Sequence, residues 1–206
     1  MADIQDPLLP SRYYHIYNHA VGKENFFETD SDYLEMLSRM EIYLLPVCHI
    51  LTYTLMPNHF HFDIQVKSNE EISEYLIERF GEDKFLSRKE ANENFVSGQV
   101  SRHFANLFSS YAKHYNFIKD RIGTLFKRAF RRAEITDLDY FKTVINYVHQ
   151  NPVEAGFVHS MKHWKYSSYN LLTGNEPTFI ARKQVIELFG GIKNFHGYHL
   201  YKSGLN

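Results

Sequence analysis

The fold of this chain is set by residues 49–66, which read HILTYTLMPNHFHFDIQV. Two runs of strand-forming residues, 49–56 and 59–66, flank the turn-prone pair Pro57-Asn58, so we expect an antiparallel hairpin. Successive side chains of a strand point to opposite faces, which divides 59–66 into an apolar and a polar face. The apolar face, expected to meet the core, carries Phe60, Phe62, Ile64 and Val66. The polar face carries His59, His61, Asp63 and Gln65.

Elsewhere the apolar spacing predicts one more strand and four helices. The strand is expected at 13–17, and the helices at 30–43, 70–80, 99–117 and 136–150. The polar segment 81–98 is interpreted as a loop, and a short extended piece is expected around Leu125 and Phe126.

The last of these helices has a recognisable start and stop. It begins at Thr136-x-x-Asp139, which resembles a capping box. We expect it to stop before Pro152, because proline lacks the backbone N–H that would continue the helix.

This order of strands and helices is typical of an α+β fold. We predict a ferredoxin-like plait, of the kind also found in RNA-recognition motifs, in which an antiparallel sheet carries helices on one face. Residues 1–175 are assigned to one domain, and 176–206 to a small C-terminal extension whose role the sequence leaves open.

The composition excludes several classes of protein. The single cysteine, Cys48, excludes a disulfide framework and a four-cysteine zinc site. The first residues lack the pattern of a signal peptide, and the most apolar stretch, 43–56, is too short to cross a bilayer. We therefore expect a cytoplasmic protein with no membrane partner. The net charge of −1 does not by itself indicate nucleic-acid binding.

Two features, on the second hairpin strand and on the last helix, are candidates for a metal site. Two imidazoles at i and i+2 of a strand can converge on one metal ion, but His59 and His61 need a further protein ligand. Tyr147 and Asn151 are four residues apart, one helical turn from each other. The Asn151 amide oxygen is a candidate third ligand, with the Tyr147 hydroxyl beside it. Each feature alone is more often a solvated strand face or a packing tyrosine, so only their combination points to chemistry.

Four blocks of the sequence together resemble one family. They read PNHFH at 57–61, GTLFKRAF at 123–130, YVHQNPVEAGFV at 147–158 and WKYSSY at 164–169. The first is similar to the His-hydrophobic-His signature of HUH single-strand nucleases and transposases. The third resembles the Tyr-x-x-x-Asn-Pro-Val-x-x-Gly stretch of the REP-associated tyrosine transposases. The chain departs from the family pattern in an inserted Ala129, a long segment at 68–98 and a tail after Pro177.

The resemblance implies a metal-dependent enzyme that cuts and rejoins single-stranded or hairpin DNA. Tyr147 would be the nucleophile and would form a 5′-phosphotyrosine intermediate. A divalent ion, Mg²⁺ or Mn²⁺, would be held by His59, His61 and Asn151. Members of related families occur as monomers and as homodimers, so both states are left open.

A basic stretch supplies candidate DNA contacts. Between Arg102 and Arg132 there are eight Lys or Arg residues against one acid, Asp120. Such a run is often only a solvated face, but aromatic residues alternate with these cations, which suits phosphate contacts combined with base stacking. The preferred contacts are Lys127, Arg128, Arg131 and Arg132.

Three alternative functions are kept open. A replication-type HUH nickase would use the same chemistry. Such a nickase normally carries a helicase domain as well, for which 206 residues leave no room. A domesticated nucleic-acid-binding module would keep the fold without catalysis. A zinc hydrolase would need a carboxylate base, for which Asp63 is the only candidate on the histidine face.

Overall fold

The computed structural model describes residues 6–22, 24–91, 94–127 and 130–202. Its centre is a four-stranded sheet in the order β2-β3-β1-β4, in which all neighbouring strands are antiparallel. The strands are β1 (Tyr13–His19), β2 (Cys48–Met56), β3 (His59–Val66) and β4 (Arg131–Ile135). Helix α1 (Asp30–Leu44) connects β1 to β2, and α4 (Phe95–Ile118) precedes β4. This is the strand order of a ferredoxin-like plait, which confirms the predicted α+β class.

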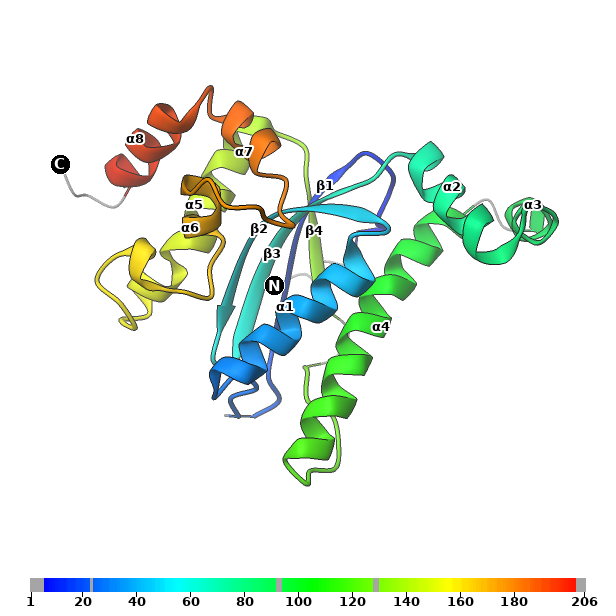
Figure 1. The fold of residues 1–206 in the computed structure, drawn as a ribbon, viewed down its shortest axis with the longest axis horizontal. Coiled ribbons are helices and arrows are strands. Elements are labelled where there is room, and N and C mark those ends of the chain that lie inside the picture. The colour runs from blue at the N-terminus through cyan, green and yellow to red at the C-terminus, as the bar shows by residue number, and fades with distance from the viewer. Residues whose placement is uncertain (1–5, 23, 92–93, 128–129, 203–206) are drawn as a thin grey trace.

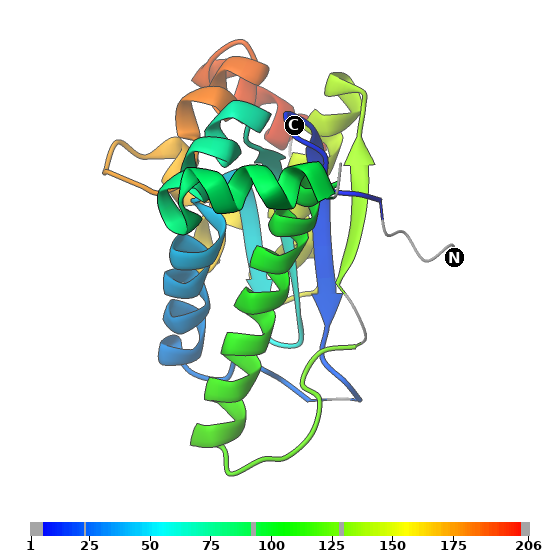
Figure 2. The same ribbon diagram turned by 90° about the vertical axis from the view of Figure 1, so that its right-hand side faces the viewer.

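Helices α1 and α4 pack against each other and cover one face of the sheet (Figures 1 and 2). The apolar side of β3 meets them as predicted: the Phe60 ring lies 5.2 Å from that of Phe108 on α4 and 4.5 Å from that of Phe62. Both Phe60 and Phe62 are fully buried. Aromatic stacking of this kind adds to the hydrophobic free energy of the core.

The opposite, polar face of the sheet is covered as well, by α5 (Leu138–Glu154). The expectation of helices on one face is therefore right for α1 and α4 but not for α5. Helix α5 has an apolar side of its own that needs a partner surface. Its buried residues include Phe141, Val144, Ile145 and Val148.

Both predicted ends of α5 require correction. Asp137, and not Thr136, caps the helix. Its side chain accepts a hydrogen bond from the Tyr140 N–H at 2.5 Å. The helix also continues through Pro152 to Glu154. Pro152 cannot donate to the carbonyl four residues before it, but the helix continues past it, because the Ala155 N–H still donates to the Asn151 oxygen at 3.0 Å. Asn151 consequently lies inside the helix, where its direction is fixed.

Two segments between β3 and α5 also differ from the prediction. The expected loop at 81–98 contains a helix, α3 (Glu82–Ala91), which Gly81 at φ 85° separates from α2 (Asn69–Phe80). The charges of α3 suit its helix dipole and Phe85 is buried, but the polar composition hides this short amphipathic pattern. The extended piece near Phe126 is one isolated bridge to Ala20, and the strand itself lies further on, in β4.

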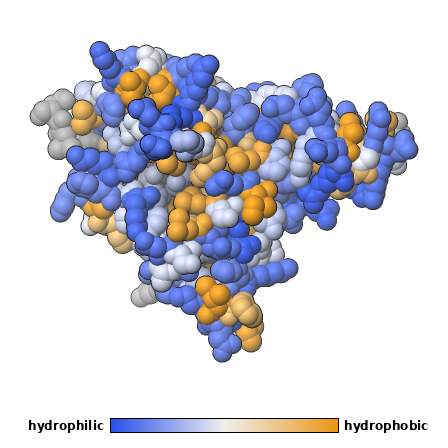
Figure 3. Space-filling model, viewed as in Figure 1, coloured by the Kyte–Doolittle hydropathy of each residue, from blue (hydrophilic) through white to orange (hydrophobic). Residues whose placement is uncertain are grey.

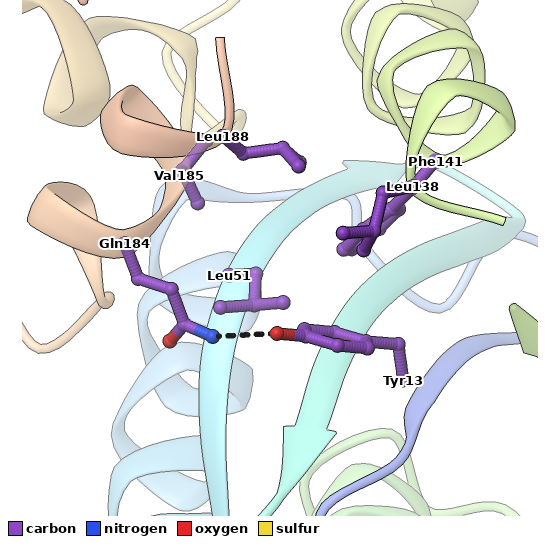
Figure 4. A pocket seen from close by; sticks show the side chains of 7 residues that line it. All are labelled: Tyr13, Leu51, Leu138, Phe141, Gln184, Val185 and Leu188. Atoms are coloured by element: carbon purple, nitrogen blue, oxygen red, sulfur yellow. Dashed lines mark hydrogen bonds between the residues drawn. The ribbon is translucent and has the colours of Figure 1, made fainter. Parts of the chain in front are cut away.

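The C-terminal residues pack onto α5 and the edge of the sheet. They form η1 (Met161–His163), α6 (Tyr169–Thr173), α7 (Arg182–Leu188) and α8 (Ile192–Lys202). Gln184 of α7 donates a hydrogen bond to the Gln65 side chain at 2.6 Å. It also donates to the Tyr13 hydroxyl at 3.3 Å, as Figure 4 shows. Phe195 of α8 is fully buried, so this segment contributes to the core.

The visible surface is largely hydrophilic, with apolar areas near the centre of this face and at the tip over the end of α4 (Figure 3). Phe117 and Ile122 are 86% and 98% exposed there. Within the described part of the chain, no helix combines the length and the apolar character that a membrane span requires.

The packing of the core predicts how much two substitutions change the free energy of unfolding. Phe62→Ala should lower the free energy of unfolding by about 3–5 kcal/mol, because it removes a buried ring and leaves a cavity. Leu34→Ala, at a position 60% exposed on α1, should change it by less than about 0.5 kcal/mol. Urea denaturation followed by circular dichroism measures both, and equal effects of the two substitutions would contradict the packing described here.

Candidate active site

The polar face of β3 continues onto β1. In the register of these strands His15 lies opposite Asp63, Tyr17 opposite His61, and His19 opposite His59. Residues that face each other across a strand pair share one side of the sheet. The two β3 histidines were predicted from the sequence but the β1 residues were not, because the alternation of a strand does not reveal which strand will pair with it.

The side chains predicted as metal ligands and nucleophile lie together. The Asn151 Oδ1 atom is 2.9 Å from His59 Nε2, and its Nδ2 atom is 3.5 Å from His61 Nε2. The same Nδ2 atom lies 3.4 Å from the Tyr147 hydroxyl, one turn back along α5. His61 is only 5% exposed, whereas Tyr147 is 42% exposed. The imidazoles and the amide therefore form the floor of the site, and the phenol stands at its rim.

A chain of hydrogen bonds orients His61. The Asp63 carboxylate is fully buried and accepts hydrogen bonds from the Thr52 hydroxyl and from His15 Nδ1, the latter at 2.7 Å. His15 Nε2 lies 3.1 Å from His61 Nδ1. Because the Asn151 amide N–H points at His61 Nε2, that atom is an acceptor, and the imidazole proton belongs on Nδ1. His61 Nδ1 then donates to His15, and its Nε2 lone pair faces the site.

Burial sets the protonation of the site. Burial, followed by the neighbouring His15, His59 and His19, holds the pKa of His61 well below its ordinary value. Burial also lowers the pKa of His59. The hydrogen bond to Asn151 raises this pKa, but the effect of burial is larger. Both imidazoles are thus neutral near pH 7, the form in which histidine binds metals. Burial raises the pKa of the Tyr147 hydroxyl, so the phenol stays protonated.

The donor set at this point fits a divalent cation. The two nitrogens of His59 each face an amide oxygen, Asn58 Oδ1 at 2.8 Å and Asn151 Oδ1 at 2.9 Å. A neutral imidazole has one N–H and satisfies only one of them. A cation between His59 Nε2 and Asn151 Oδ1 would make both atoms ligands. Among the described residues no group of three or more His, Cys, Asp or Glu forms a metal site, so a metal here depends on the amide.

A second buried histidine network anchors α5. His149 lies two residues after Tyr147 and is fully buried; its Nδ1 is 2.9 Å from His199 Nε2 on α8, and its Nε2 is 3.0 Å from the Ser168 hydroxyl. Ser168 in turn accepts a hydrogen bond from the backbone N–H of Tyr53 on β2. Burial lowers the pKa of His199 to about 4, so the network is uncharged at neutral pH. It holds the helix that carries Tyr147 and Asn151.

The structure separates the basic residues predicted to contact DNA. Lys127 and Arg131 lie near His19, whose pKa is lowered by burial and then by His59 and these two cations. Arg132 points to the other face and donates from Nε to the backbone oxygen of Asp6 at 2.5 Å. Arg128 lies outside the described residues. Of the wider cluster, Lys119 and Arg121 form ion pairs with Glu28 and Glu24.

Comparison with known proteins supports the fold. The chain is similar to a solved structure described as a REP-associated tyrosine transposase bound to a REP hairpin, with a TM-score of 0.55. The two share 13% sequence identity, and the alignment covers 86% of this chain and 89% of the other. No family model and no curated protein matches the sequence. The resemblance seen in the sequence motifs is thus confirmed at the level of the fold.

The hydrogen-bond chain predicts the tautomer of His61. In protein labelled with ¹⁵N-histidine, long-range ¹H–¹⁵N spectra at pH 7 should show His61 protonated on Nδ1 and not on Nε2. His15→Leu removes the acceptor and should allow the Nε2-protonated form to appear. The assignment is wrong if His61 carries its proton on Nε2 in the unmodified protein, because His15 would then be the donor.

Proposed function

We propose that this chain is a metal-dependent enzyme that cleaves and rejoins single-stranded or hairpin DNA, in the manner of an HUH tyrosine transposase. The observation that carries the proposal is the convergence of His59, His61, Asn151 and Tyr147 at one point of the sheet. The fold likeness supports it, since that neighbour is described as a tyrosine transposase in complex with a hairpin. Low sequence identity limits that support to the scaffold, so the chemistry rests on the site.

In the proposed reaction the Tyr147 oxygen attacks a phosphodiester. A bond forms between the phenolic oxygen and phosphorus, and the bond from phosphorus to the 3′ oxygen breaks. The proton lost by the phenol is balanced by the proton gained by the released 3′-hydroxyl. The product is a 5′-phosphotyrosine, and a second 3′-hydroxyl reverses the step and joins new strands without ATP.

The phenol needs help, because its pKa is raised and a protonated tyrosine is a weak nucleophile. A bound Mg²⁺ or Mn²⁺ would polarise the phosphate and stabilise its developing negative charge. His59, His61 and Asn151 are the residues that would hold it. The Asn151 Nδ2 atom, 3.4 Å from the Tyr147 hydroxyl, positions the nucleophile beside the same site.

Structural features weigh against the alternative functions. A zinc hydrolase would need Asp63 as its base, but that carboxylate is fully buried and both its oxygens accept hydrogen bonds. A binding module without catalysis would have no need for a phenol, two imidazoles and an amide in one place. A nickase would share this chemistry, and the strand-joining step separates it from a transposase.

Tyr147→Phe should abolish DNA cleavage, because it removes the attacking oxygen and keeps the ring. The measurement is a denaturing gel of labelled single-stranded repeat DNA incubated with Mn²⁺, which displays both the cut strand and the covalent adduct. His61→Ala should also abolish cleavage, and excess Mn²⁺ should partly restore it. DNA binding by Tyr147→Phe should be retained.

The structure supplies the matched control for this experiment. Tyr17 lies opposite His61 with ring centroids 6.0 Å apart and is the tyrosine whose oxygen rivals that of Tyr147. Tyr111 and Tyr115 are buried on the other side of the sheet, where their hydroxyls donate to backbone oxygens of Phe26 and Asn25. Tyr17→Phe should still form the adduct. If it does not, while Tyr147→Phe does, the nucleophile has been misassigned.

Lys127→Glu combined with Arg131→Glu should weaken binding of single-stranded DNA at least tenfold near 0.1 M salt. The slope of log K against log salt should become shallower by roughly 0.7 for each phosphate that these side chains no longer neutralise. Titrations monitored by fluorescence anisotropy at several salt concentrations measure both. Lys183→Glu with Lys193→Glu makes the same charge change on α7 and α8 and serves as control. Equal effects of the two pairs would show that only net charge matters.

A further inference from the structure

A hollow of about 340 Å³ opens beside the proposed nucleophile, between β4 and α5. It shares two residues with the site, His15 and Tyr147, and is otherwise lined mainly by apolar side chains and one further tyrosine. Its apolar and aromatic walls are formed by Ala133, Ile135, Tyr140 and Val144. Tyr140 is 60% exposed and lies on the same helix as Tyr147, two turns before it.

Apart from the tyrosine hydroxyls, the polar groups around the hollow are engaged elsewhere. The Thr143 hydroxyl lies 2.9 Å from the Tyr198 hydroxyl on α8. The Glu134 N–H donates to the Asp6 carboxylate, and the Glu134 side chain lies 3.4 Å from the Arg12 guanidinium. His15 is held by Asp63 and His61. The hollow therefore offers apolar and aromatic surface, and few groups that could read a hydrogen-bonding pattern.

Small Ala133 keeps the hollow open. In the β1–β4 register Ala133 lies opposite His15, on the side of the sheet that α5 covers. A longer side chain at this position would extend toward Tyr140 and Tyr147. The methyl group of Ala133 instead leaves a slot between β4 and α5, and Tyr140 and Tyr147 form the aromatic wall of this slot.

We infer that this hollow binds the unpaired base of the nucleotide adjacent to the scissile phosphate. The inference rests on the proposed function, because it takes Tyr147 as the group that meets the phosphate. A base is joined to its phosphate through one sugar, so a phosphate at the Tyr147 hydroxyl brings a base to the mouth of the hollow. Flat, largely apolar faces and an exposed tyrosine suit a nucleobase, which stacks on aromatic side chains.

The apolar and aromatic lining of the hollow suits stacking more than recognition of the base edge. Stacking is available to every base, since each has a π-face, whereas discrimination needs donors and acceptors aimed at the base edge. With Thr143, Glu134 and His15 engaged elsewhere, the hollow has few groups that could select a sequence, and its main effect is to hold the strand next to the nucleophile. The chemical class of its ligand is an unpaired nucleobase of either type, purine or pyrimidine.

A double-mutant cycle tests the inference. The cleavage position is first mapped from the covalent adduct, and oligonucleotides are made with a normal or an abasic nucleotide on each side of it. Binding is then measured by anisotropy in EDTA, so that cleavage does not interfere. Tyr140→Ala should weaken binding of the normal strand at least fivefold. Tyr140→Ala should change binding by less than twofold for the abasic strand that lacks the base bound in the hollow.

Two further variants make the result specific. Ala133→Leu, which fills the hollow without touching a proposed metal ligand, should reproduce the effect of Tyr140→Ala. Tyr201→Ala removes a tyrosine that is 68% exposed on α8 and should have no effect on either strand. Equal weakening of normal and abasic strands by Tyr140→Ala would overturn the inference while leaving the adduct, and with it the proposed function, intact. Failure to form any adduct would overturn both.

Discussion

One buried carboxylate governs the arrangement of the whole polar face of the sheet. Asp63 lies beneath α5 with no exposed surface, and an uncompensated charge in such a place would cost several kcal/mol. Its two oxygens are satisfied by Thr52 on β2 and by His15 on β1. Each of those partners is bound in a fixed orientation as a result. Through His15 the constraint reaches His61, whose Nε2 lone pair is thereby directed into the site, toward Asn151.

The second requirement is that α5 sits at one position over this face. Its apolar residues alone would permit sliding along the sheet, because hydrophobic contact is not directional. His149 removes that freedom by hydrogen bonds to α8 and to Ser168, which is itself bonded to the backbone of β2. Tyr147 and Asn151 lie on the same helix, one on each side of His149. The C-terminal segment thus contributes to the geometry of a site that it does not line.

Much of the scaffold could be predicted from the sequence, because its periodicities are strong. The β2–β3 hairpin, α1 and most of α5 follow from alternation or helical spacing in the residues themselves. Strand β4 could not be found in this way, since the five residues RRAEI put only Ala133 and Ile135 on an apolar face, and the strand is recognised through its pairing with β1. Helix α3 was missed for a related reason, because its one buried aromatic residue leaves little periodic signal.

The site shows the same division between local and non-local information. The spacing of His59 and His61, and of Tyr147 and Asn151, is local, and it selected these four only in combination with the family resemblance of the blocks that contain them. His15 and Tyr17 enter through the register of β1 with β3, which joins distant parts of the chain; His15 and His61 are 46 residues apart. Likewise, the basic cluster is continuous in sequence, but a strand sends Arg131 and Arg132 to opposite faces.

The exposure of the site residues connects this geometry to the proposed chemistry. His61 and Asn151 are buried and neutral, so they are preorganised and would need no further desolvation to bind the proposed cation. Tyr147 is partly exposed, and its raised pKa keeps the hydroxyl protonated in the absence of substrate. A protonated phenol is a weak nucleophile toward phosphate esters in solution. In the proposed reaction, activation of Tyr147 would require a strand and a cation together, which would confine cleavage to DNA that is already held against the sheet.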